Sequence, residues 1–482
     1  MTVSESDRFY AAFKAKDARF DGRVFIGVTS TGIYCRPVCR ARLPKAAHCR
    51  YFRTAAEAEC AGFRPCLLCR PEQAPGLSVT DASSSLARRA AKLLAANCGS
   101  GFDMESLAGK LGCTARHLRR VFTEAYGVTP IRYLQTCRLH LAKALLADTA
   151  LTITDAAMAS GFGSLRRFND ACQKQYRLTP TELRGQSKAS SGITVTIGFR
   201  PPYPWAGMLD FLARRAIAGV EVVRDGQYWR TIQMAANGQA SRGWICAEMH
   251  PHKHAIVLTL SESLLPVLPQ VMVRARALFD LDCDPEAICE VLSGMEGIRP
   301  GLCVKGTRLP GCFDPFELSV RAVLGQQIAV KAASTLSGRV AAAFGEAIET
   351  GIEGLTHTFP APECFDAPEA NPAEALSALG IIAARARAIV ALAQGIAAGA
   401  LVLHDGGRPE EEMAKLCAIQ GIGNWTAQYI AMRAMGWTDA FLETDAAVKK
   451  ALTPRTPKEM LAAAEAWRPW RSYAVMNLWN SL

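Results

Sequence analysis

The sequence predicts a multidomain protein that is mainly α-helical with α+β parts. Its 482 residues are too many for one hydrophobic core, so three or four domains are expected. Two close pairs of cysteines near the N-terminus indicate a small metal-binding domain. A motif that recurs after 50 residues indicates two copies of one helical unit, and apolar periodicity over the last third is typical of a helical bundle.

The charge is distributed unevenly along the chain. Residues 1–185 hold 28 Lys and Arg against 15 Asp and Glu, whereas residues 186–482 hold 27 against 29. The basic half is therefore expected to bind a polyanion, with nucleic acid as the first candidate. A merely solubilising surface is the alternative, and the repeated arginine-bearing helices described below disfavour it.

No membrane span is expected, because no apolar run approaches the length that crosses a bilayer. The N-terminal residues MTVSESDRFYAAF lack the pattern of a secretory signal. Seventeen cysteines in such a chain indicate a reducing cytoplasm, with free thiols and a metal site.

The four paired cysteines predict a zinc site. The pairs, separated by 26 residues, are Cys35 with Cys39 and Cys66 with Cys69. Four thiolates suit tetrahedral zinc, and the spacing alone favours a structural role over a reactive one. Cys49 and Cys60, outside the pairs, are expected to be ordinary buried thiols.

Residues 1–75 closely resemble the N-terminal domain of the Ada adaptive-response family. The resemblance lies in TGIYCRPVC and YFRTAAEAECAGFRPCLLCRPE. It implies that Cys35 accepts a methyl group from a methylphosphotriester in DNA, once only, while Cys39, Cys66 and Cys69 complete the zinc site. Methylation removes one negative charge from the site, so DNA binding is expected to tighten.

Residues 80–185 carry the internal repeat. Tyr126–Pro130 recurs as Tyr176–Pro180, and a glycine turn at Gly112 or Gly161 precedes an arginine-bearing helix in each copy. Ser164 is expected to cap the second of these helices. An exposed arginine helix that follows a short turn is typical of a helix that enters the major groove. The predicted DNA-contacting residues are Arg116, Arg119, Arg120, Arg166 and Arg167.

The same segment resembles the AraC-type double helix-turn-helix domain. That resemblance implies binding to promoter DNA at two successive major-groove segments and an activator that contacts RNA polymerase. It also implies a cytoplasmic, nucleoid-associated location in a bacterium. Arg177 stands where the first copy has Gly127, so the second turn is expected to differ slightly.

Residues 186–192 are polar and small and predict a linker. Beyond it, residues 193–305 alternate in a way that favours a small antiparallel sheet with helices. The expected strands are Ile193–Ile197, Val220–Val223, Tyr228–Met234, Gly243–Ala247 and Ala255–Thr259. His250, His252 and His254 lack cysteine or carboxylate partners, which favours a polar loop over a metal site.

The stretches RPPYPW and MLDFLARRA in this mixed α/β segment resemble the N-terminal domain of the 3-methyladenine DNA glycosylase II family, the AlkA type. The resemblance implies that Phe211 contributes to the wall of a base pocket. The alternative, that Phe211 is a core residue of an amphipathic helix, stays open.

Residues 306–482 predict an all-α domain. The expected helices are Pro315–Val330, Ala332–Ala343, Ala373–Leu379, Arg385–Ala398, Glu410–Ile419, Trp425–Met435, Ala446–Leu452, Lys458–Trp467 and Tyr473–Trp479. Between two of them lies a turn with Gly421 and Gly423, which can take backbone angles that side chains forbid and so approach a phosphate. Asp445 follows at the start of another helix, as an N-cap or a catalytic acid.

The turn and PWRSYAVMNLW near the end resemble the helix-hairpin-helix DNA glycosylase superfamily. The resemblance implies that Asp445 is catalytic and that Trp425, Tyr429 and Trp479 line the base pocket. A plain core role is the alternative, above all for Tyr429. Bifunctional relatives carry a nucleophilic lysine where Trp425 stands, so excision without strand cleavage is expected. Gln327 stands where the AlkA type has a leucine that fills the gap left by a flipped nucleotide.

Together these features predict a methyl-sensing transcriptional activator fused to a glycosylase that excises alkylated bases such as 3-methyladenine from double-stranded DNA. Two alternatives remain. The C-terminal half could bind DNA without catalysis, which Asp445 and the pocket aromatics disfavour. The N-terminal half could be a structural zinc and DNA tether, which TGIYCRPVC disfavours.

Overall fold

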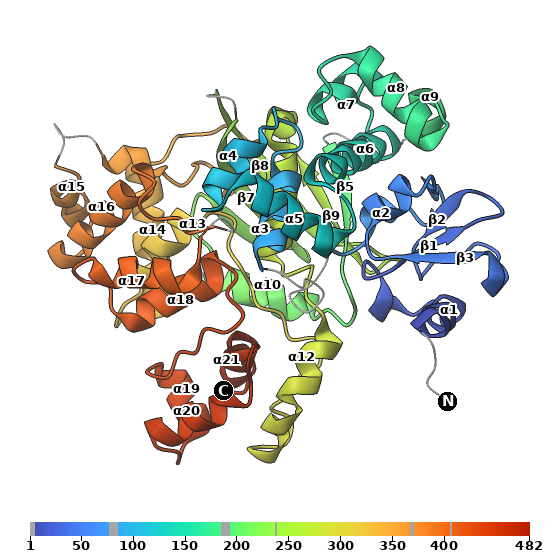
Figure 1. Cartoon of the computed structure of the whole chain (residues 1–482). Coiled ribbons are helices and arrows are strands. Elements are labelled where there is room, and N and C mark those ends of the chain that lie inside the picture. The colour runs from blue at the N-terminus through green and yellow to red at the C-terminus, as the bar shows by residue number, and fades with distance from the viewer. Residues whose placement is uncertain (1–4, 77–84, 185–192, 237–238, 367–370, 405–406) are drawn as a thin grey trace.

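The fold is that of a computed structural model (Figure 1), which describes residues 5–76, 85–184, 193–236, 239–366, 371–404 and 407–482. In the view of Figure 1 the N-terminal segments lie on the right and the C-terminal helices on the left and below. The predicted linker at residues 186–192 lies outside the described residues. Within the described residues, no helix has the length and apolar character that crossing a membrane requires.

The N-terminal segment folds around a four-stranded sheet of order β3-β1-β2-β4. Strands β2 and β4 are parallel and pair Tyr34 with Pro65. Because Cys35 and Cys66 each come one residue later, this register places the two cysteine pairs side by side. The elements are α1 (Glu5–Ala15), β1 (Phe25–Val28), β2 (Ile33–Cys35), β3 (Cys49–Phe52), α2 (Ala55–Cys60) and β4 (Arg64–Pro65).

The next segment contains two helix-turn-helix units joined by the long helix α6. Thr114 and Ser164 cap the second helix of each unit, and each hydroxyl accepts a backbone N–H three residues on. The cap predicted at Ser164 is therefore confirmed. The helices are α3 (Ser85–Ala96), α4 (Met104–Lys110), α5 (Ala115–Tyr126), α6 (Pro130–Asp148), α7 (Ile153–Ala159), α8 (Leu165–Tyr176) and α9 (Pro180–Leu183).

The second unit keeps the turn of the first although arginine replaces glycine. Gly127 has φ 70° and Arg177 has φ 54°, both left-handed. Each donates its N–H to the carbonyl four residues earlier, at 2.9 Å for Gly127 and 3.0 Å for Arg177. The two turns differ only slightly, as expected, with ψ −2° at Gly127 and 32° at Arg177.

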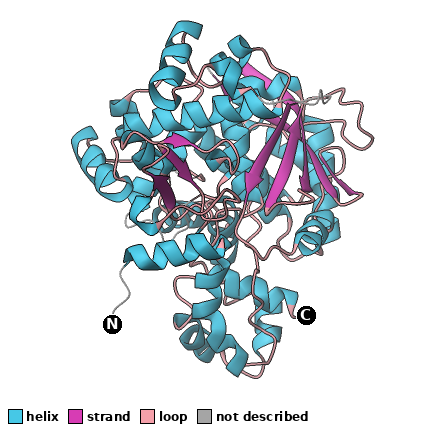
Figure 2. Ribbon diagram, turned by 90° about the vertical axis from the view of Figure 1, so that its right-hand side faces the viewer, coloured by secondary structure: helices cyan, strands magenta, loops and turns pink. Residues whose placement is uncertain are grey.

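The mixed α/β segment contains a five-stranded sheet of order β5-β9-β8-β7-β6, whose neighbouring strands all pair antiparallel. The predicted antiparallel sheet is thus confirmed, with β7 and β8 longer than expected. Figure 2 shows it apart from the smaller N-terminal sheet. The elements are β5 (Ile193–Gly198), α10 (Trp205–Ala213), β6 (Glu221–Arg224), β7 (Gln227–Ala236), β8 (Gln239–Met249), β9 (Ala255–Leu260), α11 (Leu268–Leu278) and α12 (Pro285–Leu292).

The C-terminal segment is helical, as predicted. One predicted helix is too long: the helix expected to reach Val330 ends at Leu324, with Gly325 as its C-cap. Gln327 then has a left-handed φ of 56°, which a continuing helix could not contain. The helices are α13 (Pro315–Leu324), α14 (Val330–Phe344), α15 (Pro372–Ala378), α16 (Ala383–Ala397), α17 (Pro409–Ala418), α18 (Asn424–Ala434), α19 (Ala446–Leu452), α20 (Pro457–Glu465) and α21 (Arg471–Asn480).

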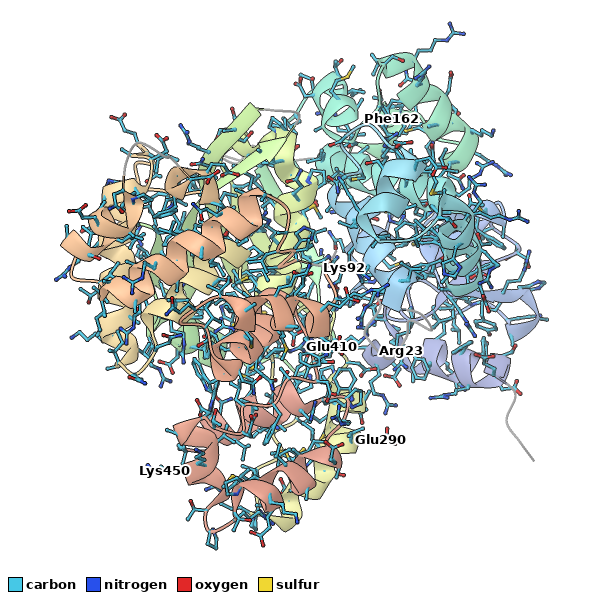
Figure 3. The ribbon with its side chains drawn as sticks, turned by 60° about the vertical axis from the view of Figure 1, so that its left-hand side comes forward. Arg23, Lys92, Phe162, Glu290, Glu410 and Lys450 are labelled. Atoms are coloured by element: carbon cyan, nitrogen blue, oxygen red, sulfur yellow. The ribbon has the colours of Figure 1, made fainter. Side chains whose placement is uncertain are left out.

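The two halves of the chain share one hydrophobic core. Buried Leu94 of the helix-turn-helix segment, Ile197 of the sheet and Trp470 near α21 belong to the same cluster, and α3 packs against α11. An ion pair of 2.7 Å joins Arg23 to Asp284 across this boundary. Arg23 and Lys92 are labelled there in Figure 3.

Candidate functional site

One cavity of about 1160 Å³ collects the residues assigned to the base pocket and the DNA contacts of the C-terminal half. Helices α10, α18, α19 and α21 and the loop between α13 and α14 surround it. The predicted residues that line it are Phe211, Gln327, Gly421, Gly423, Trp425, Tyr429, Asp445 and Trp479. Segments more than 200 residues apart in sequence therefore meet at one place, which spacing along the chain cannot reveal.

Asp445 is the N-cap of α19, and its carboxylate is held by donors of two kinds. Oδ1 accepts the backbone N–H groups of Ala447 and Val448 at 2.9 and 3.0 Å. Oδ1 also accepts the indole N–H of Trp479 at 3.0 Å, and Oδ2 accepts that of Trp425 at 3.2 Å. The N-cap and catalytic interpretations are thus compatible, because the cap fixes a carboxylate that still lines the cavity.

Three of the aromatic residues, Trp425, Tyr429 and Trp479, form a continuous wall. The rings of Trp425 and Tyr429 are stacked with centroids 5.3 Å apart and an interplanar angle of 8°. Trp479 lies 6.3 Å from Tyr429. Phe211 is buried in α10 and also lines the cavity, so it combines the two interpretations left open by the sequence. Flat rings of this kind offer stacking faces for a planar base.

Three arginines beside this wall were not predicted as site residues. Arg433 donates to the Tyr429 hydroxyl at 2.7 Å. Burial alone would raise the pKa of Tyr429, but the guanidinium groups of Arg433, Arg215 and Arg321 outweigh it and lower that pKa. Arg433 stands four residues after Tyr429 in an otherwise uncharged helix, and this spacing is a sequence signal that it faces Tyr429.

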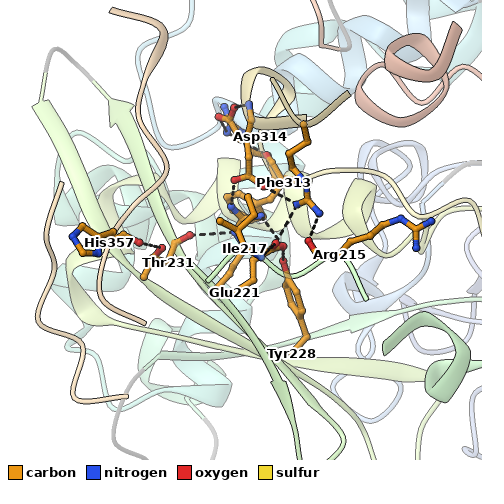
Figure 4. A network of polar contacts seen from close by, with 12 residues as sticks. Arg215, Ile217, Glu221, Tyr228, Thr231, Phe313, Asp314 and His357 are labelled. Atoms are coloured by element: carbon orange, nitrogen blue, oxygen red, sulfur yellow. Dashed lines mark hydrogen bonds and ion pairs between the residues drawn. The ribbon is translucent and has the colours of Figure 1, made fainter. Parts of the chain in front are cut away.

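Carboxylates compensate only part of this positive charge. Arg321 pairs with Glu221 at 3.1 Å, and Arg230 pairs with Glu317 at 2.6 Å. Figure 4 shows the network of polar contacts around Glu221. Arg215 makes no ion pair within the described residues, and its guanidinium lies 3.8 Å from the centroid of Phe211. Burial, together with the neighbouring arginines, lowers the pKa of Arg215 to about 10.

The turn before α18 requires glycine at one position only. Gly421 has φ 95°, a conformation that side chains rarely adopt. Gly423 has φ −90° and ψ 174°, which is ordinary extended backbone, and an added Cβ there would meet no atom within 4 Å. The argument from forbidden angles is therefore wrong for Gly423, and its predicted phosphate contact rests on its position at the N-cap.

The four paired cysteines form a compact cluster. The Sγ atoms of Cys35, Cys39, Cys66 and Cys69 all lie within 4.8 Å of one another, and the cluster is the one such group of potential metal ligands among the described residues. Four sulfurs around tetrahedral zinc lie roughly 3.8 Å apart, given Zn–S bonds of about 2.3 Å. The donor set therefore fits zinc.

The other two cysteines of this segment differ from the expectation. Cys60 is exposed and Cys49 is half-buried, so the prediction that both are buried thiols is wrong. Cys60 ends α2, a helix that buries Ala56, Ala58 and Glu59 instead.

The predicted DNA-contacting arginines all lie on exposed faces of α5 and α8. The opposite faces of these helices bury apolar residues such as Leu118 and Phe168. Arg120 lies 3.8 Å from Glu124, an exposed pair that contributes little to stability. The exposed residues are Arg116, Arg119, Arg120, Arg166 and Arg167.

Three family models match the chain. The metal binding domain of Ada matches residues 8–72, a helix-turn-helix domain matches residues 107–186, and the AlkA N-terminal domain matches residues 194–314. Together they cover the zinc cluster, both arginine helices and the sheet that precedes the cavity helices.

Some relatives match the whole chain, and others match only its C-terminal or its N-terminal part. A probable bifunctional transcriptional activator/DNA repair enzyme AlkA of Mycobacterium tuberculosis is 37% identical over 99% of this chain and 96% of its own length. DNA-3-methyladenine glycosylase 2 of Escherichia coli is 38% identical over 59% of this chain and 96% of its own length. The bifunctional transcriptional activator/DNA repair enzyme AdaA of Bacillus subtilis is 31% identical over 38% of this chain and 84% of its own length.

Proposed function

Because the chain belongs to the family of AlkA-type bifunctional transcriptional activators and DNA repair enzymes, we propose that it carries out two reactions on alkylated DNA. The C-terminal half excises alkylated bases such as 3-methyladenine, and the N-terminal half takes a methyl group from a methylphosphotriester. The observation that carries the first activity is the Asp445 carboxylate, held by two indoles at an aromatic cavity.

In the proposed excision, the bond between the sugar C1′ and the base nitrogen breaks, and its electron pair leaves with the base. The sugar becomes positively charged, and the Asp445 carboxylate stabilises this charge. A water oxygen then bonds to C1′, and the water loses one proton to the solvent. Hydrogen bonds fix both carboxylate oxygens beforehand, so little reorganisation is needed as the charge develops.

The cavity wall supports selection of alkylated purines. A flipped base can stack against the parallel pair of Trp425 and Tyr429. Methylation at a ring nitrogen makes a purine positively charged, and a cation is attracted to the faces of electron-rich rings. The same charge weakens the bond to the sugar, so the selected bases are also the ones that leave easily.

Excision leaves an abasic site and does not cut the strand. A glycosylase with lyase activity needs an amine that forms a Schiff base with the sugar. Trp425 occupies the position of that lysine, and no lysine is present among the described residues that line the cavity.

In the sensor half, Cys39, Cys66, Cys69 and Cys35 hold zinc, which supplies positive charge that keeps the thiols ionised. The Cys35 sulfur attacks the methyl carbon, the carbon–oxygen bond breaks, and the phosphotriester becomes an ordinary phosphodiester. A thioether does not return the methyl group, so each chain reacts once.

Methylation of Cys35 is the proposed activating signal. The reaction removes one negative charge from the cysteine cluster, which lowers repulsion from the DNA backbone. The exposed arginines of α5 and α8 then hold promoter DNA more tightly. Bound in this way, the chain recruits RNA polymerase.

The excision activity is tested by incubating the chain with methylated duplex DNA and measuring the release of free bases. Asp445→Asn keeps the size of the side chain but removes its charge, and we expect release to fall by about 100-fold or more. The control is Glu443→Gln, a neighbouring carboxylate outside the cavity lining, which leaves release unchanged. Undiminished release by Asp445→Asn refutes the mechanism.

The methyl transfer is tested by mass spectrometry of the chain after exposure to DNA that contains methylphosphotriesters. One methyl group is expected on the peptide that contains Cys35. A methyl group on any other cysteine contradicts the assignment.

A further inference from the structure

We propose that Gln326 and Arg385 are positioning residues for base flipping. They fix the loop of residues 325–329, here named the intercalation loop, to the glycine turn before α18, and so hold Gln327 at the mouth of the cavity. This inference rests on the proposed excision activity and names the device that prepares the DNA for it.

The intercalation loop has a conformation that needs support. Helix α13 ends at Leu324, and three residues later the chain reaches the left-handed φ of 56° at Gln327. A residue with a side chain pays about 1–2 kcal/mol for this region, so the conformation persists only where neighbours impose it. Gln327 is exposed, lines the cavity, and makes no side-chain hydrogen bond within the described residues.

Gln326 supplies the first constraint. Its side-chain Nε2 donates to the carbonyl oxygen of Gly421 at 2.9 Å and to the hydroxyl of Thr426 at 3.0 Å. Gly421 belongs to the turn proposed to hold the DNA backbone, and Thr426 lies in the first turn of α18. The side-chain amide of Gln326 therefore joins the intercalation loop to the glycine turn and to α18, across nearly 100 residues of sequence.

Arg385 of α16 supplies the second constraint. Its guanidinium donates to the backbone carbonyls of Leu324 and Gln326. Both carbonyls lie where α13 ends and lack partners within the helix, and a positive group is favoured there. Gln326 is thus held twice, through its side chain by the turn and through its carbonyl by α16.

Flipping a nucleotide requires that the protein contacts the DNA backbone and fills the position that the nucleotide leaves in the base stack. A rigid connection between Gly421 and Gln327 lets one docking event accomplish both, because the side chain is already placed when the phosphate binds. Glutamine stacks less well than leucine, so its placement matters more here. Weakening the connection between Gly421 and Gln327 is expected to slow excision where a stable base pair must be broken. It should matter little where the base pair is already weak.

The test compares two duplexes, each with a single 7-methylguanine, paired with cytosine in one and opposite thymine in the other. Gln326→Met preserves the size of the side chain but removes its donor. We expect the single-turnover rate of base release to fall about 10-fold opposite cytosine and by less than about 2-fold opposite thymine. Gln394→Met, on the exposed side of α16, is the matched control and keeps both rates.

Arg385→Lys, which retains the charge but loses the two-point contact, should show the same difference between the duplexes, whereas Arg387→Lys on the same helix should not. Equal losses on both duplexes, or no loss, overturn the proposal.

In the Asp445→Asn background, fluorescence of a 2-aminopurine beside the lesion reports flipping without excision, and this fluorescence should fall with Gln326→Met. A parent chain that flips the base but releases none refutes the excision proposal instead.

Discussion

The Asp445 carboxylate receives its hydrogen bonds from three helices: the backbone of α19, Trp425 of α18 and Trp479 of α21. These hydrogen bonds fix the orientation of the carboxylate at the cavity. In the proposed site the two indoles have two roles, because each would offer a face to the base and donates an N–H to the acid. At the scale of single residues, the proposal therefore gives recognition and catalysis the same side chains.

Trp479→Phe separates these roles, since phenylalanine keeps an aromatic ring but lacks the N–H that Asp445 Oδ1 accepts at 3.0 Å. We expect the single-turnover rate of base release to fall about 10-fold, with a smaller change in DNA affinity. Trp244→Phe, in strand β8 outside the cavity lining, serves as the control. An unchanged rate for Trp479→Phe would show that orientation of the acid does not depend on this indole.

Tyr429 yields a prediction about pH. Burial opposes ionisation, but three guanidiniums favour the phenolate and lower the pKa of Tyr429. Near-ultraviolet absorbance should therefore show one tyrosine ionising below the ordinary pH of about 10, and Tyr429→Phe should remove this step. Burial raises the pKa of Tyr51 to about 12, so Tyr51→Phe leaves the early step in place. Identical early titrations of parent and Tyr429→Phe would contradict the electrostatic description.

The sequence could predict the residues with a distinctive local pattern. Asp445 and Trp425 lie near a recognisable turn, and the cavity contains both. Arg215 and Arg321, which also lie near Tyr429, could not be assigned in the same way, because they come from different segments and only the fold brings them together. From sequence alone, an arginine on a predicted helix is expected to be exposed to solvent, as most charged residues are.

At the scale of elements, the second helix-turn-helix unit keeps its turn at an energetic cost. Arg177 is exposed and left-handed, so Arg177→Gly should stabilise this segment by about 1 kcal/mol. Lys174→Gly, in the last turn of the same helix, should destabilise it by about the same amount. Urea unfolding followed by fluorescence checks both. A loss of stability in Arg177→Gly would show that the arginine side chain contributes more than its backbone strain costs.

Most helices of the C-terminal segment could be predicted within a few residues, because their buried faces repeat with the helical period. Helix α13 is the exception. Gly325, the C-cap of α13, is a local stop signal that the prediction passed over, and contacts from α16 and the glycine turn hold the loop that follows. The local sequence pattern predicts which face of an element is apolar, but it does not predict the contacts that distant elements make.

At the scale of the whole molecule, the sensor and excision halves are packed together. Gly76 donates its N–H to Asp282 at 2.8 Å, and Arg23 pairs with Asp284, so the N-terminal segment contacts the α11–α12 region directly. The charge difference between the halves could be read from the sequence. Their docking could not, since the contacts join residues about 200 or more positions apart and carry no local signature.

The proposed function has two parts in one chain: catalytic base excision at Asp445 and a single methyl transfer at Cys35. The most direct measurement uses DNA alkylated with a labelled methyl group and counts label in free bases and label on the protein. The parent should release many labelled bases per chain and retain one methyl group at Cys35. Asp445→Asn should lose the first signal by about 100-fold and keep the second. Base release that survives in Asp445→Asn would contradict the proposed excision mechanism, and label that accumulates at another residue would contradict the proposed methyl transfer to Cys35.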